Sequence, residues 1–218
     1  MLAFGDAIEA TLKSDVRFVG FERVRTLRWA NGTNHYLHKL FEFEVMKGNQ
    51  FSARWGWSID FVPAIKGGRL VSKRTASKAE FDLCIDPIDS SGSIPSWCSF
   101  TSSDSGPQVA KIGKASFDVA IADLNEVITL GDLADLFQIR SAMEFRRFSL
   151  ENYCQTDLAW GLALIAIGQD RAGQDHLDAF CENFNLTRDL AALKKAEAEA
   201  KLAAPKAQRG RTLRHNAE

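Results

Sequence analysis

Residues 36–62, YLHKLFEFEVMKGNQFSARWGWSIDFV, decide how this chain folds. Two runs of alternating apolar and polar residues flank the segment 47–49, a pattern typical of a half-buried β-hairpin. The apolar side chains of both runs, among them Phe41 and Trp55, occupy odd-numbered positions. Because opposed residues share one face of a sheet, odd positions must pair with odd positions. The pattern therefore predicts a three-residue loop at 47–49.

The register set by this loop predicts two different sheet faces. Phe41 lies opposite Trp55 on an aromatic face, whereas Glu42 lies opposite Arg54 on a charged face that also carries Glu44. A cross-strand charge pair on a solvated face contributes only about 0.2–1 kcal/mol. On this interpretation, exchanging the charges of Glu42 and Arg54 should change stability by less than about 1 kcal/mol.

The rest of the N-terminal half predicts one helix and further strands. Apolar residues at helical spacing indicate a helix over 2–14, and the arginine-rich segment 22–29 indicates one strand with a bulge, followed by a turn at 31–32. Alternation returns in Phe81, Leu83 and Ile85, which predicts a fourth strand, and 97–101 predicts a fifth.

A basic segment separates the hairpin from the fourth strand. Residues 64–79 contain five basic residues, two adjacent glycines and no acid, which predicts an exposed loop. Two interpretations stay open. The loop is simply solvated, or Arg69, Lys73 and Arg74 bind an anionic group of a partner.

Beyond residue 105 the period of the apolar residues changes from 2 to 3.6, which predicts helices. Ser116 stands where a cap would begin the first of them, and Thr129 with Asp132 resembles a capping box that begins the next. Residues 157–167 are apolar nearly all round and predict a buried helix. A last helix, rich in Ala, Glu and Lys, is expected to end at Pro205.

These patterns together predict an α+β protein. We expect residues 1–105 to form an antiparallel sheet of four to five strands with an N-terminal helix, residues 106–204 to form a helical region packed on that sheet, and residues 205–218 to be a disordered tail.

Composition narrows the classes of partner and compartment. The 218 residues are 45% hydrophobic with a formal net charge of −1, which gives no reason to expect nucleic acid as a partner. The longest apolar run is far too short for a bilayer, so we expect no membrane and a cytoplasmic location. The four cysteines are scattered and predict free thiols. His35 and His38 are three apart on a predicted strand and point to opposite faces, so they predict no metal site.

The N-terminal half resembles a family catalogued as domain of unknown function 4304. The residues that carry the resemblance are the first helix, then Val19-Gly20-Phe21-Glu22-Arg23 and Arg25-Thr26-Leu27-Arg28-Trp29, and the aromatic strands ending in Trp57-Ser58-Ile59-Asp60. The resemblance covers roughly the first 100 residues. It implies an antiparallel sheet and brings neither an activity nor a catalytic residue.

Two functions from different classes fit the sequence. The first is a non-enzymatic module that binds a protein partner through the charged sheet face, the basic segment or the acidic helix face between residues 114 and 140. The alternative is a hydrolase-like enzyme with Glu42, Glu44 and Arg54 in a cleft on the sheet face, because acid–base catalysis needs two carboxylates in different environments. The sequence predicts no cofactor, assigns no catalytic residue and does not specify the oligomeric state.

Overall fold

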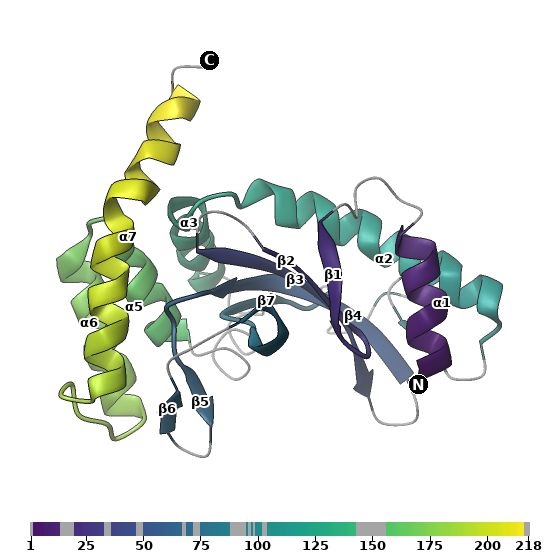
Figure 1. The fold of residues 1–218 in the computed structure, drawn as a ribbon, viewed down its shortest axis with the longest axis horizontal. Helices are drawn as coiled ribbons and strands as arrows, with labels where there is room; N and C mark the ends of the chain where they lie inside the picture. The colour runs from purple at the N-terminus through teal and green to yellow at the C-terminus, as the bar shows by residue number, and fades with distance from the viewer. Residues whose placement is uncertain are drawn as a thin grey trace.

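A computed structural model describes residues 2–13, 20–32, 36–46, 50–66, 69–71, 75–87, 95, 97, 99–101, 104–142 and 156–215 of the protein. The protein is α+β, as predicted. An antiparallel sheet crosses the middle of the molecule, with α1 (Leu2–Lys13) near one end and α5 (Thr156–Ala166), α6 (Asp170–Asn183) and α7 (Ala191–His215) together at the other (Figure 1).

The central hairpin organises the sheet. Its register confirms the prediction, because Phe41 pairs with Trp55, Glu42 with Arg54 and, at the end of the pairing, Met46 with Gln50. The strands lie in the order β1-β2-β3-β4-β7, and β8 pairs with the other end of β4. Their bounds are β1 Phe21–Arg25, β2 Arg28–Gly32, β3 Leu37–Met46, β4 Gln50–Ile59, β7 Leu83–Ile85 and β8 Ser99–Thr101.

The sheet has six strands because the segment 22–29 is not the single strand that the sequence predicted. β1 and β2 form a hairpin around Thr26 and Leu27, so the parity shift between Val24 and Leu27 that suggested a bulge spans this turn, and the irregularity of the pairing lies between Arg23 and Arg25. Neither Thr26 nor Leu27 is a typical turn residue, so no local pattern predicted a turn there. The turn is instead held from outside, because the Phe43 N–H donates to the Leu27 carbonyl at 2.9 Å.

The basic segment is also more ordered than an exposed loop. β5 (Ala64–Lys66) and β6 (Arg69–Val71) form a separate two-stranded sheet, and a 3-10 helix, η2 (Ala76–Lys78), follows. The half-buried Ile65 and Leu70 pack against the main core, which anchors this small hairpin. Runs of three residues are too short for alternation to reveal a strand.

The helical half begins at residue 106. The helices are α2 Gly106–Glu126, α3 Leu130–Ser141, α5 Thr156–Ala166, α6 Asp170–Asn183 and α7 Ala191–His215. The predicted cap at Ser116 is wrong, because Ser105 caps α2 and Ser116 lies buried inside it, where its hydroxyl donates to the Trp97 carbonyl. The capping box of Thr129 and Asp132 is confirmed at the start of α3.

The last helix does not end where the sequence predicted. α7 passes through Pro205 and its backbone is helical to His215, so a proline alone did not end it. The segment around Pro205 is rich in Ala, Lys, Gln and Arg, which are strong helix formers. Residues 216–218 of the predicted tail lie outside the described residues.

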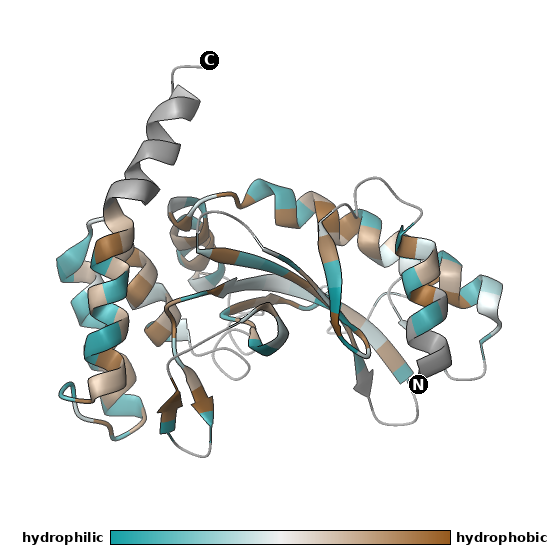
Figure 2. Cartoon of the chain, viewed as in Figure 1, coloured by the Kyte–Doolittle hydropathy of each residue, from teal (hydrophilic) through white to brown (hydrophobic). Residues whose placement is uncertain are grey.

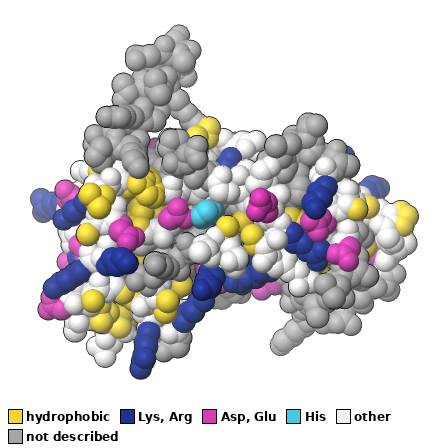
Figure 3. Space-filling view, viewed as in Figure 1, with side chains coloured by type: hydrophobic (Ala, Val, Ile, Leu, Met, Phe, Trp, Pro, Cys, Tyr) yellow, Lys and Arg dark blue, Asp and Glu magenta, His cyan; other side chains and the backbone are white. Residues whose placement is uncertain are grey.

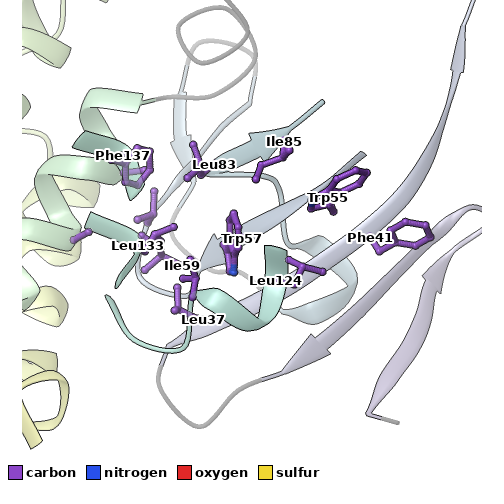
Figure 4. Close-up of a cluster of buried hydrophobic side chains, with 14 of the residues drawn as sticks. Leu37, Phe41, Trp55, Trp57, Ile59, Leu83, Ile85, Leu124, Leu133 and Phe137 are labelled. Carbon is purple, nitrogen blue, oxygen red and sulfur yellow. The ribbon is translucent and has the colours of Figure 1, made fainter. Parts of the chain in front are cut away.

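One cluster of buried side chains joins the aromatic face of the sheet to the helices. Hydrophobic and hydrophilic residues alternate along α2, which covers this face (Figure 2). Figure 4 shows Phe41, Trp55 and Trp57 of the sheet beside Leu124 and Phe137 of the helices. The Trp55 indole N–H also donates to Asp123 Oδ2 at 2.8 Å, which satisfies its polar atom inside the core.

Candidate functional site

The charged face of the sheet is covered, whereas the sequence predicted a solvated face. Glu42 lies between Arg28 of β2 and Arg54 of β4, and only 9% of its side chain is exposed. Its Oε2 atom accepts from Arg28 Nε, and its Oε1 atom accepts from Arg54 Nε at 2.6 Å. Both carboxylate oxygens are thus engaged by guanidinium groups, an arrangement that offsets the cost of burying these charges.

Residues 75–81, which we call the strap, cover this face. Arg28 Nη1 donates to the Ala79 carbonyl at 2.8 Å, and Arg25 Nη2 donates to Glu80 Oε1 at 3.0 Å. Ala79 is fully buried against Ala30 and Leu40, which project from the same sheet face. The strap is therefore held by a small apolar contact and by arginines from neighbouring strands.

Phe81 belongs to the strap and not to the fourth strand, which corrects the sequence prediction. The strand β7 begins at Leu83, and the Phe81 ring lies 5.4 Å from the Arg28 guanidinium carbon and 5.3 Å from that of Arg54. These are cation–π distances. Phe81 thus packs on the charged face, whereas Leu83 and Ile85 point into the aromatic core.

Charges within this cluster shift the pKa values of its members. Burial opposes ionisation of Arg54, but the negative charges around it, Glu42 first, prevail and raise its pKa. Burial would likewise raise the pKa of Glu80, yet Arg28 and Arg25 outweigh it and lower that pKa. Both shifts favour the ionised forms of Arg54 and Glu80, which is consistent with the ion pairs that these residues form.

Glu42, Glu44 and Arg54, the residues of the hydrolase alternative, do lie together. Their contacts with one another are ion pairs, as expected of a structural role. Glu44 has 48% of its side chain exposed and pairs with Arg54 at 3.0 Å. Glu42 is fully engaged, as described above. A general base needs a lone pair directed at a substrate, and both oxygens of Glu42 are already held by guanidinium groups.

The basic residues lie on a different sheet. Arg69 is the exposed first residue of β6 and lies directly opposite Lys66 of β5. Neither residue forms an ion pair within the part of the chain that is described. Figure 3 shows Lys and Arg side chains projecting from this region of the surface, at the lower left. Lys73 and Arg74 lie outside the described residues.

Sequence reasoning missed Arg28 and Glu80. Arg28 pairs with Glu42 across β2 and β3, a register that the unrecognised β1–β2 turn concealed. Glu80 is 38 positions from Glu42 in the chain, and no local pattern places it over the sheet. If residues 28–32 are taken as a separate strand, the alternation of side chains places Arg28 on the charged face, but it does not place Glu80 there.

A histidine pair and a bilayer-spanning segment were also considered from the sequence. His38 Nε2 lies 2.5 Å from Asp60 Oδ1, and His35 lies outside the described residues. No group of three or more potential metal ligands is found among the residues described. No described helix is long and apolar enough to span a bilayer.

The strap yields a first prediction. Glu80→Gln removes the charge that pairs with Arg25 and Arg28, so the strap should open more often. Two partly exposed pairs contribute about 1 kcal/mol together, which corresponds to about fivefold faster tryptic cleavage after the exposed Lys78. Glu22→Gln, at an exposed position of β1, is the matched control and should leave the rate unchanged. Equal rates in all three proteins would show that Glu80 does not hold the strap.

Comparison with known proteins adds no relative. A scan against protein-family models, a search of curated proteins and a search of solved structures each found no match to this chain. The resemblance to domain of unknown function 4304 therefore stays a prediction.

Proposed function

We propose that this protein is a non-enzymatic protein-binding module that docks an acidic segment of its partner on the β5–β6 hairpin. The observation that carries the proposal is the pairing of Lys66 with Arg69. Like charges directly opposite each other destabilise a two-stranded ladder. Neither cation has an acidic neighbour within ion-pair distance among the described residues, so a bound carboxylate would relieve the repulsion.

The chemistry of the hairpin favours carboxylates. The Arg69 guanidinium presents a planar fork that matches a carboxylate, and Lys66 adds a compact charge beside it. Ile65 and Leu70 fix the hairpin to the core, which limits the entropy lost when a partner binds. Lys73 and Arg74 follow closely in the sequence and add two positive charges to this segment.

A protein partner fits this chain better than a nucleic acid. The formal net charge is −1, and the basic residues of 64–79 lack the interleaved aromatic residues of a nucleic-acid platform. We place the protein in the cytoplasm, where buried cysteines such as Cys84 and Cys181 stay reduced thiols. The ion pairs that occupy both oxygens of Glu42 weigh against the hydrolase alternative.

The test compares two double variants of equal charge change. Lys66→Glu with Arg69→Glu should weaken binding of a polyglutamate peptide, measured by fluorescence anisotropy at low salt, by about tenfold or more. It should also lose the partners that the native protein recovers in a quantitative pull-down. Lys111→Glu with Lys201→Glu, at two exposed positions elsewhere, is the control and should retain both. Equal weakening in the two variants would mean that only net charge attracts the peptide, and would refute the hairpin site.

A further inference from the structure

Lys39 is a half-buried cation on the aromatic face of the sheet. It pairs with Asn31 of β2 and with Trp57 of β4, both of which are uncharged. Its Nζ atom donates to Asn125 Oδ1 at 2.9 Å, near the C-terminal end of α2. The cross-strand neighbours of Lys39 and the acceptor of its amine are therefore all uncharged.

Several other lysines of the chain do have an acidic partner. Lys13 pairs with Glu9 at 2.8 Å, Lys114 with Asp118 at 3.4 Å, and Lys194 with Asp189 at 2.7 Å. No carboxylate among the described residues lies within ion-pair distance of Lys39. Burial without a counter-ion disfavours the ammonium form and lowers the pKa of Lys39.

The charged groups nearest to this position on α2 do not compensate it. Asp123 accepts the indole N–H of Trp55, and Glu126 is exposed at the end of the helix. The helix C-terminus carries a partial negative charge that favours a cation, and this effect is weak compared with a full carboxylate. On β3 itself, the neighbouring His38 points to the opposite sheet face, where it meets Asp60.

We propose that the Lys39 amine is a covalent modification site that condenses reversibly with small aldehydes. The neutral amine attacks the carbonyl carbon, and the resulting carbinolamine loses the carbonyl oxygen as water, with both amine protons, to give an imine. The reaction needs no oxidant or leaving group other than water. Lys39 is only partly buried, so its amine stays accessible to small carbonyl compounds, and the lack of a counter-ion supplies the neutral amine that the attack requires.

The experiment measures reductive methylation of each lysine in the folded, full-length chain. Formaldehyde with cyanoborohydride is added at limiting concentration across a pH series, and mass spectrometry of peptides reports each site. Because the midpoint of a pH profile does not depend on steric access, we expect Lys39 to reach half its maximal rate at lower pH than the exposed Lys111 and Lys201. In urea this difference should vanish. A Lys39 midpoint equal to those of the exposed lysines would overturn the proposal.

Asn125→Asp provides a second, independent readout. It places a carboxylate where the amide oxygen now accepts from Lys39, which stabilises the ammonium form. The Lys39 rate at neutral pH should fall about tenfold, as for a midpoint raised by about one pH unit, while Lys111 is unchanged. An unchanged Lys39 rate in a folded variant would show that missing charge compensation is not the cause of the reactivity.

Discussion

Glu42→Gln is expected to lower the free energy of unfolding by about 3–5 kcal/mol, the cost of breaking a buried ion pair from one side. Glutamine keeps the shape of the side chain but leaves Arg28, with only 8% of its side chain exposed, beside a neutral amide. Glu80 also contacts Arg28, at 3.3 Å, and is too exposed to replace Glu42. Urea unfolding followed by tryptophan fluorescence measures the loss.

Glu44→Gln is the matched control. Glu44 lies on the same strand and contacts the same Arg54, yet it is half exposed, so the expected loss is below about 1 kcal/mol. Similar losses for the two variants would contradict the burial of Glu42.

The double exchange Glu42→Arg with Arg54→Glu is expected to destabilise the protein, whereas the sequence alone predicted a change in stability of less than about 1 kcal/mol. A solvated pair would tolerate it, but arginine at position 42 would meet Arg28 inside the covered face. We expect the double variant to be destabilised at least as much as Glu42→Gln.

Trp55→Ala is expected to cost about 3–5 kcal/mol, the usual range for emptying a large aromatic site in a core. Trp55 is 1% exposed and lies opposite Phe41 under α2. Its loss also leaves Asp123 without the indole donor. The measurement is again urea unfolding, followed by circular dichroism because a tryptophan is removed.

Trp55→Phe separates the two contributions. Phenylalanine retains much of the buried ring but cannot donate to Asp123, so we expect an intermediate loss. A loss below about 1 kcal/mol for Trp55→Ala would mean that this face of the hairpin is not the core.

The sequence predicted correctly the structural features that depend on residues close together in the chain. Parity on both sides of 47–49 determined the register of β3 and β4, because a shift of one position would move Phe41 and Trp55 out of the core. Thr129 and Asp132 determined the start of α3, because a capping box satisfies its own backbone donors within four residues. The α+β class followed from the change of period near residue 105.

The candidate site needed the tertiary structure. Glu42 and Arg54 were correctly paired, but whether that face is wet or covered depends on the strap, which lies far along the chain and carries no periodic signal. The pairing of Arg28 with Glu42 was not predicted, because the sequence did not show that β2 is a strand separate from β1. Local patterns show strand alternation and helix caps, because these depend on residues that are neighbours in the sequence. The burial of a side chain depends on contacts with segments that are distant in the sequence, so local patterns do not show it. Tertiary packing alone therefore made this charged face a structural ion-pair network and left Lys39 without a counter-ion among the described residues.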